Sequence, residues 1–369
     1  MKYNKIHAYY FLIFSIIISY AFVRGFRMPG LWSINYYLPS FFDGFYRRGL
    51  AGTIIYFLGD CKFNYYSIVI IQFLVLFLLL SWVYYFFQKN ILIMLIISLY
   101  LISPMGAYLF HEVGYIDQLI YLILFISIAL FQRHKYISVI LFASSMLIHE
   151  LTLFVTLPIY FTYLYMTTNN LEESILCVLP SLVLFLIIYM FLQTVPTETI
   201  DLFKNKISDL SNYKVKDSFY EIFKNEFTGS RNKLYYSHSS LNQIFLLFFV
   251  SGTISAISYK MGERKILSLL IFLVGLSPLL LGIFGWDLDR WYFLSLSSST
   301  IIFVLFVTAY RISFKELASI PATFVLYLIF YSLLISNTHL EYFNGYEPRI
   351  MSKSSLQEVR NEFFKIPIN

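Results

Sequence analysis

Long apolar runs separated by short polar gaps dominate the chain. A membrane-spanning helix needs about 20 mostly apolar residues, within a range of roughly 17–25. Eleven runs come close to that length and are predicted as helices: 7–23, 65–87, 91–110, 116–131, 136–149, 151–166, 174–195, 241–259, 266–284, 291–310 and 318–336. The pattern predicts an all-α, polytopic integral membrane bundle of about eleven transmembrane helices, in a single domain over residues 1–369.

The stretch 136–166 has two interpretations. It is either one long helix kinked before Pro158, or two short helices that meet at His149-Glu150. Lys and Arg in short loops stay cytoplasmic. With a cytoplasmic N-terminus and two short helices, the inner side holds ten basic residues, and the short outer loops hold only Arg290. A single helix would invert everything downstream and reduce this bias to about six against five, so we expect two short spans or a re-entrant pair.

The ten inner basic residues are Lys2, Lys5, Lys89, Arg133, Lys135, Lys260, Arg264, Lys265, Arg311 and Lys315. Three long polar stretches then fall on the outer face: 24–64, 196–240 and the tail 337–369. Long loops cross the membrane largely regardless of charge. The basic residues of 196–240 therefore do not oppose this topology.

Composition agrees with a membrane location. Hydrophobic residues make up 59% of the chain and charged residues 13%, with a mean hydropathy of +0.69. A soluble domain has about 25% charged residues, so this chain cannot cover a soluble surface. The net charge of +6 follows from the basic inner loops and does not indicate a nucleic-acid partner. No GxxxxGK[ST], HExxH or CxxC pattern occurs, so ATPase, zinc-protease and thiol-redox functions have no support.

Ionisable residues near the helix ends form four groups. They are Asp43 with Arg47 and Arg48, His111-Glu112 with Asp117, His149-Glu150, and Asp287 with Asp289 and Arg290. Charge in the hydrocarbon is costly, so such residues are functional candidates by default. All four groups fall on the outer face of the topology above. None of their acids or histidines entered the Lys/Arg count, so this agreement is independent of it.

Each group also has a purely structural interpretation. The His-Glu pair that ends the third run can bond a neighbouring helix, and the pair at the short-helix junction can simply stabilise that junction. Arg47 and Arg48 can anchor their loop to phospholipid phosphates. Asp287 and Arg290 stand three residues apart and can form a local ion pair at the start of the tenth helix.

Together the groups offer carboxylates for proton abstraction, histidines that titrate near neutral pH, and arginines suited to bidentate phosphate contact. Glycosyl transfer from a polyprenyl-phosphate-linked sugar needs these parts: a base deprotonates the acceptor hydroxyl, and cations stabilise the departing diphosphate. We expect the base among Asp43, Glu112, Glu150 and Asp287, with Arg47, Arg48 and Arg290 holding the diphosphate. His111, Asp117, His149 and Asp289 would support them. No cofactor or metal ligand set is predicted, and a divalent metal is left open.

The whole pattern resembles the Wzy-type (EpsG-like) O-antigen and polysaccharide polymerases, within the wider GT-C class of multi-pass glycosyltransferases. The resemblance rests on the number of spans, on a long first outer loop bearing Asp43, and on a large later outer loop. The segment Asp287-Leu288-Asp289-Arg290-Trp291-Tyr292-Phe293 is similar to the Asp-then-Arg-aromatic segment of EpsG-like polymerases. Many GT-C enzymes carry an Asp-x-Asp in the first outer loop, whereas this chain has its Asp-x-Asp at Asp287 and Asp289.

The resemblance implies a glycosyltransferase in the bacterial inner membrane with its active site facing the periplasm. Its leading form is an O-antigen polymerase of lipopolysaccharide biosynthesis that joins undecaprenyl-diphosphate-linked oligosaccharides, among membrane lipid and with a chain-length regulator as a possible partner. One alternative is a GT-C enzyme that transfers a single sugar from undecaprenyl phosphate. Another is a lipid-linked oligosaccharide flippase, but a carrier places its charges near the bilayer midplane, in related halves. Here the charges gather at one face and no related halves occur, which favours an enzyme.

Overall fold

The computed structural model describes residues 2–58, 65–111, 113–192, 194–210, 217–224, 238–283, 287–338 and 340. Helices make up 84% of these residues, and no strand occurs among them. Seven of the described helices are long and apolar enough to cross a membrane. The protein is therefore an all-α, multi-pass membrane protein, as the apolar runs predict.

The seven membrane-length helices are α1 (Lys2–Gly25), α4 (Tyr65–Phe87), α9 (Thr156–Thr168) with the 3-10 helix η2 (Glu150–Leu153) before it, α10 (Leu171–Phe191), α13 (His238–Lys260), α14 (Lys265–Leu276) with the 3-10 helix η3 (Ser277–Ile283) after it, and α15 (Leu288–Ala309). Three further apolar helices are shorter: α7 (Ile116–Phe131), α8 (Lys135–Ile148) and α17 (Pro321–Asn337). They have 16, 14 and 17 residues. A total of eleven crossings therefore stays a prediction.

The third apolar run, 91–110, was predicted as one continuous helix. The structure divides it into two. The run forms α5 (Ile91–Ile102) and α6 (Pro104–His111), bent by 68° relative to each other. Ser103, between them, has an extended backbone with φ −67° and ψ 159°. A residue before proline is pushed out of the helical region by the proline ring, so Pro104 explains the break.

The chain reverses direction at His149. This residue is extended, with φ −163° and ψ 137°, between the end of α8 and the start of η2. Thr152 bonds back to the Ser145 carbonyl at 3.1 Å. Further from the turn, the Tyr160 ring stacks on Phe142 with centroids 4.1 Å apart. Residue numbers thus rise on α9 as they fall on α8, which makes the two helices antiparallel and supports the interpretation as two short segments.

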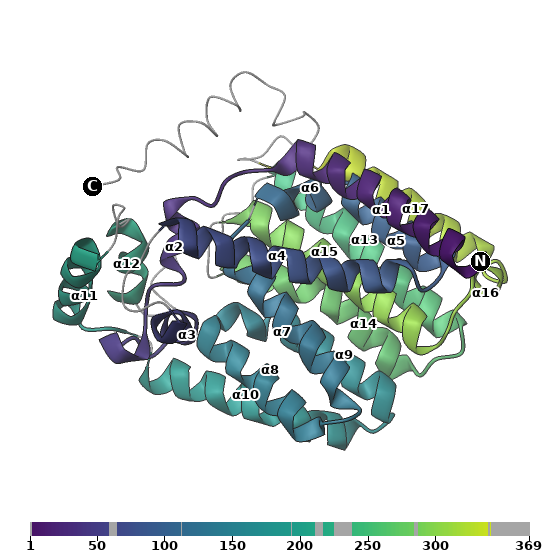
Figure 1. Cartoon of the computed structure of the whole chain (residues 1–369). Helices are drawn as coiled ribbons and strands as arrows, with labels where there is room; N and C mark the ends of the chain where they lie inside the picture. The colour runs from purple at the N-terminus through teal and green to yellow at the C-terminus, as the bar shows by residue number, and fades with distance from the viewer. Residues whose placement is uncertain are drawn as a thin grey trace.

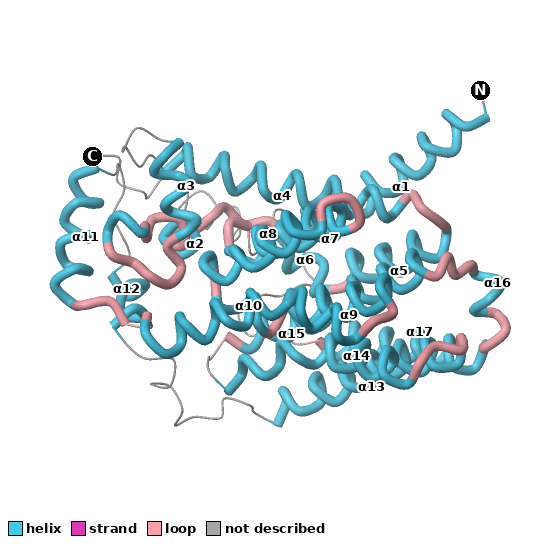
Figure 2. The backbone as a smooth tube through the Cα atoms, turned by 90° about the horizontal axis from the view of Figure 1, so that it is seen from below, coloured by secondary structure: helices cyan, strands magenta, loops and turns pink. Residues whose placement is uncertain are grey.

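Five short helices gather at one end of the bundle and form what we call the cap. They are α2 (Leu31–Asn35), the 3-10 helix η1 (Phe41–Asp43), α3 (Leu50–Leu58), α11 (Thr197–Leu210) and α12 (Asp217–Lys224). Figures 1 and 2 both place them at the left, with the N-terminus and α16 (Phe314–Leu317) at the far right. Aromatic rings join the two halves of the cap: Phe45 lies 4.8 Å from Phe203 and 5.0 Å from Phe223. The described parts of the two predicted outer loops, 24–64 and 196–240, thus pack on each other.

Helix α15 is the central helix of the bundle. Of its most apolar stretch, 83% is buried inside the protein. Small residues allow its neighbours to approach closely, as is common between membrane helices. Ser299 bonds Ser251 of α13 at 3.0 Å, and Ser295 donates to the carbonyl of Gly275 on α14. This packing fixes the N-terminal turn of α15 beneath the cap.

Candidate functional site

The first turn of α15 and the first turn of α7 are joined by a buried ion pair. Arg290 donates from Nε and Nη2 to the two carboxylate oxygens of Asp117, at 2.7 Å each. The predicted tenth helix began at 291, but α15 begins at Leu288 and so includes Arg290 in its first turn. The hydrogen-bonded partner of Arg290 is Asp117 on another helix. Asp287 also lies close enough to interact with the Arg290 charge, so the local interaction exists beside the pair with Asp117.

A second buried ion pair ties the cap to the bundle. Arg48 Nε lies 2.9 Å from each carboxylate oxygen of Glu150, and Nη2 also donates to Oε1. Burial is the largest single influence and lowers the pKa of Arg48, but the charge and hydrogen bonds of Glu150 together outweigh it and raise that pKa overall. Arg48 therefore stays charged.

Arg48 also has an unfavourable backbone conformation. Its φ of +56° lies in the left-handed region, which costs a residue with a Cβ roughly 1–2 kcal/mol relative to the right-handed form. Glycine would occupy this position more easily. Such outliers concentrate at functional sites, where the surroundings hold them in place. The ion pair with Glu150 is what holds the side chain here.

Tyr36 connects the two ion pairs. Its hydroxyl lies 3.4 Å from Arg290 Nη1, and its ring packs 5.6 Å from the His149 ring. The Tyr36 ring also lies 5.8 Å from Tyr115, over which the Arg290 guanidinium stacks at 5.0 Å. No pattern in the sequence singled out Tyr36. With aromatics at 20% of the chain, a tyrosine in an outer loop is expected to be an interfacial residue.

His149 has a buried nitrogen that meets no hydrogen-bond partner in the described part of the chain. Its Nδ1 accepts a bond from the Leu151 backbone N–H at 3.1 Å. A neutral imidazole that accepts at Nδ1 carries its proton on Nε2. Nε2 is buried and has no acceptor among the described residues. Buried donors are nearly always paired, so this N–H is available to a ligand.

Asp287 stands immediately before α15 and is half-buried. Burial raises the pKa of its carboxyl to about 6; the nearby Arg290 charge opposes the rise, and the Asp289 carboxylate adds to it. A base is most effective when its pKa lies near the working pH. Asp289 is fully buried in the first turn of α15.

Asp43 and Arg47 stabilise the cap. Lys206 on α11 bonds Asp43 at 2.7 Å and stacks over the Tyr56 ring at 4.6 Å. Arg47 donates to the carbonyl of Ile222 and stacks on the Phe223 ring at 5.5 Å. Burial lowers the pKa of Arg47 to about 10. Both residues thus have partners in the later outer stretch, which sequence spacing could not reveal.

His111 ends α6 and is buried, with its ring 5.3 Å from Tyr108. Glu112, the remaining predicted carboxylate, lies outside the described residues. Within the described ranges, no group of three or more His, Cys, Asp or Glu side chains is arranged to hold a metal ion. Of the three predicted bases that the structure describes, Glu150 and Asp43 form salt bridges, and Asp287 is the one that does not.

The candidate site therefore consists of two ion-paired arginines, Tyr36 and His149 between them, and Asp287 beside Arg290. We call this set the two-arginine site. Its electrostatic coupling is direct, since the pKa of Arg48 is also lowered by the charge of Arg290. Comparison of the chain with family models, with curated proteins and with solved structures finds no match. The chemistry of the site must therefore be argued from its own geometry.

Proposed function

We propose that this protein is a glycosyltransferase of bacterial surface-polysaccharide assembly, acting at the periplasmic face of the inner membrane on a polyprenyl-linked donor. Its leading form is an O-antigen polymerase that joins undecaprenyl-diphosphate-linked repeat units. The observation that carries the proposal is the pairing of two buried arginines around a histidine whose Nε2–H has no acceptor among the described residues. Three donors gathered at a membrane boundary suit a diphosphate headgroup.

The ion pairs leave part of each guanidinium unused. Arg48 and Arg290 both meet their carboxylates through Nε and Nη2. A guanidinium has five N–H donors in a fixed fork, so the two N–H groups of each Nη1 remain outside the pair. In Arg290, Tyr36 is the described neighbour of that end. In this proposal Asp117 and Glu150 are positioning residues, and the Nη1 groups with His149 Nε2–H contact phosphate oxygens.

Asp287 is the proposed general base. Glu150 and Asp117 are already engaged by guanidinium groups, and Asp43 is engaged by Lys206. Asp287 takes the proton of the acceptor hydroxyl, and the hydroxyl oxygen then bonds the anomeric carbon of the donor sugar. The bond from that carbon to the diphosphate oxygen breaks, and the oxygen keeps the electron pair. Cations at the oxygen stabilise the charge that develops there.

The transport alternative has less support. A flippase needs a polar route for its sugar headgroup through the bundle. The cavity among α4, α5, α6, α7 and α15 is small, about 70 Å³, and most of its lining side chains are apolar. A larger cleft of about 1000 Å³ lies at the C-terminal ends of α4, α7, α9 and α15 and shares only Phe86 and Leu305 with this cavity. Transfer of a single sugar from undecaprenyl phosphate would use the same two-arginine site and is the second candidate.

The test is complementation of a deletion strain, with the lipopolysaccharide ladder as readout. Asp287→Asn, Arg48→Lys and Arg290→Lys should insert normally yet give short ladders, because lysine lacks the bidentate fork. Asp209→Asn, on the exposed face of α11, is the matched control and should give a normal ladder. Membrane levels are compared by blot.

Two outcomes decide between the candidates. A polymerase deletion leaves core plus one repeat unit, whereas loss of a single-sugar transferase or of a flippase does not. Absence of that single-unit product would remove the polymerase and favour the single-sugar enzyme. Normal ladders from all three variants at normal membrane levels would contradict the two-arginine site itself.

A further inference from the structure

A cleft of about 1000 Å³ opens among α4, α7, α9 and α15, close to the C-terminal end of each helix. Three basic residues line it: Lys89, Arg133 and Arg311. Each follows the end of one helix, α4, α7 and α15 respectively. Among the described residues that line the cleft, none is acidic. We call it the cationic cleft.

The cationic cleft lies at the opposite end of the bundle from the two-arginine site. Asp117 is in the first turn of α7 and Arg133 follows its last turn; Arg290 and Arg311 are related in the same way on α15. Helix α15 has 22 residues, so it is about 33 Å long at about 1.5 Å per residue. A bilayer core is about 30 Å thick, so the two sites face opposite membrane boundaries.

The basic side chains of the cleft form no salt bridge with the described carboxylates. Arg133 and Arg311 are exposed and have no carboxylate partner among the described residues. Lys89 contacts Tyr85, with a 2.8 Å hydrogen bond to its hydroxyl and a distance of 4.0 Å to its ring centre. Arg311 has a φ of +54°, a conformation that glycine adopts more easily. In a purely structural role, these cations would only set membrane orientation and offset the partial negative charge of helix ends. Such a role does not require the three basic residues to line the same cleft.

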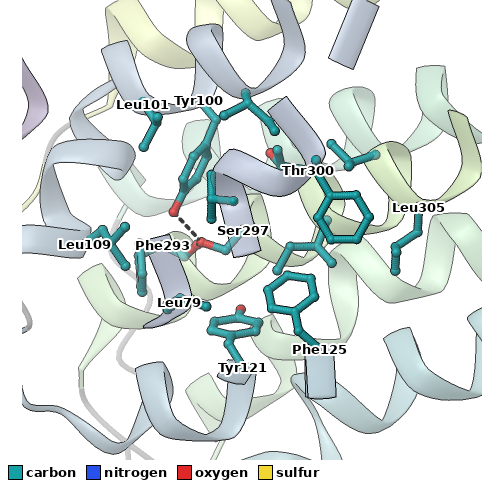
Figure 3. Close-up of a pocket in the computed structure, with 15 residues that line it drawn as sticks. Leu79, Tyr100, Leu101, Leu109, Tyr121, Phe125, Phe293, Ser297, Thr300 and Leu305 are labelled. Carbon is teal, nitrogen blue, oxygen red and sulfur yellow. Dashed lines mark hydrogen bonds between the residues drawn. The ribbon is translucent and has the colours of Figure 1, made fainter. Parts of the chain in front are cut away.

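The wall of the cleft is apolar on the side toward the bundle interior. Phe86 and Leu305 line both the cationic cleft and the small cavity of about 70 Å³. Figure 3 shows Leu305 and Phe125 at that cavity, with Tyr121 beside Phe125 and Tyr100 bonded to Ser297 at 2.8 Å. Phe86 and Leu305 therefore form an apolar wall shared by the charged cleft and the small apolar cavity.

We propose that the cationic cleft binds an anionic phospholipid, with its phosphate among Lys89, Arg133 and Arg311 and one chain along Phe86 and Leu305. Guanidinium and ammonium groups hold phosphate oxygens well. A soluble anion would match the mouth but leave the apolar wall unused. A lipid matches both, and lipid is the solvent at this depth. This inference does not depend on the proposed glycosyl transfer.

Trp82 lines the cleft and provides the probe. The full chain is placed in phosphatidylcholine nanodiscs that contain a fixed fraction of either brominated phosphatidylglycerol or brominated phosphatidylcholine. Bromine quenches tryptophan on contact, and subtracting the signal of a Trp82→Phe variant isolates Trp82. We expect stronger quenching of Trp82 by the anionic lipid than by the zwitterionic lipid at the same fraction.

The matched variants separate a site from a general surface charge. Combined Lys89→Gln, Arg133→Gln and Arg311→Gln should abolish the excess quenching by phosphatidylglycerol. Combined Arg264→Gln, Lys265→Gln and Lys315→Gln removes three charges at the start of α14 and on α16, outside the lining of the cleft, and should keep the excess. Size-exclusion profiles check that both variants fold.

Three results would overturn the proposal. One is equal quenching by both lipids, and another is an excess that survives the triple change in the cleft. The third is loss of the excess on adding inorganic phosphate but not chloride at equal ionic strength, which would assign the cleft to a soluble phosphate compound. Persistence of the excess in inorganic phosphate supports the lipid.

Discussion

Arg290 and Asp117 stand 173 residues apart in the chain and meet through two parallel hydrogen bonds of 2.7 Å. Both side chains are buried. The pair fixes the first turn of α15 against the first turn of α7, and it also aims the rest of the Arg290 guanidinium toward Tyr36. Positioning of the site and packing of the helices thus depend on the same contact.

Removing one member of this pair should destabilise the protein strongly. Asp117→Asn leaves the Arg290 charge buried without a carboxylate, and breaking a buried pair in this way costs about 3–5 kcal/mol. The measurement is thermal unfolding of the detergent-solubilised protein by size exclusion. Asp117→Leu combined with Arg290→Met removes both charges and should recover much of the stability without activity. Equal stability of the single and double variants would contradict a buried charge pair.

Activity should depend on pH through Asp287. Its pKa is raised to about 6, so the carboxylate needed as a base increases as pH rises through 6, and the rate should rise to a plateau above it. Asp287→Asn should lower the rate about 10²–10⁴-fold and remove this dependence. The assay is transfer from a lipid-linked donor in proteoliposomes. A pH profile unchanged by the substitution would show that another group is the base.

The same shift has a consequence for stability. The folded protein binds the Asp287 proton more tightly than the unfolded chain, because the pKa is raised from 3.8 to about 6. The contribution of this carboxyl to stability therefore falls as pH rises from about 4 to about 6 and stays constant above that. Unfolding of the wild type and of Asp287→Asn at both pH values should reveal the difference, which the amide variant lacks.

Tyr36 should act mainly through its ring. Tyr36→Phe keeps the contacts with His149 and Tyr115 and removes only the 3.4 Å contact with Arg290. A hydrogen bond of 3.4 Å between the neutral hydroxyl and the guanidinium is weak. We therefore expect less than about a tenfold loss of activity, or about 1.4 kcal/mol. Tyr36→Ala opens a cavity and should cost about 3–5 kcal/mol of stability. If Phe proved as inactive as Ala, the hydroxyl would have to contact the substrate.

Membrane topology can be tested with reporter fusions. The ten-to-one bias of Lys and Arg predicts that basic short loops stay inside. Reporters should therefore be active in the cytoplasm after Lys89, Arg133, Lys260 and Arg311. The same bias predicts periplasmic activity at Asn212 and Asn369. A cytoplasmic signal at Asn212 would contradict the division of 136–166 into two crossings, and with it the common outer face of the ionisable groups.

Much of the helical organisation could be predicted from the sequence, because apolar runs of membrane length have few alternatives to helix. The gathering of ionisable residues at one end could also be predicted, since Asp117, Glu150 and Arg290 all stand at ends of apolar runs. Which carboxylate pairs with which arginine could not be predicted, because the topology assigns residues to a membrane face and gives no distances between them. The salt bridge of Asp43 with Lys206 of the cap could not be predicted for the same reason. The bend at Ser103 was not predicted, although a residue before proline is disfavoured in a helix, and no pattern distinguished Tyr36 from the other aromatics.

The separation of Arg290 and Asp117 along the chain also sets an order of events during synthesis. Chains grow at about 5–20 residues per second, so the 173 residues between the partners take roughly 9–35 s to emerge. Throughout that interval α7 is already made and the arginine that matches its carboxylate does not yet exist. A lone carboxylate in a bilayer is costly, so α7 settles in its final depth only when α15 arrives. The last third of the polypeptide thus completes the placement of the first.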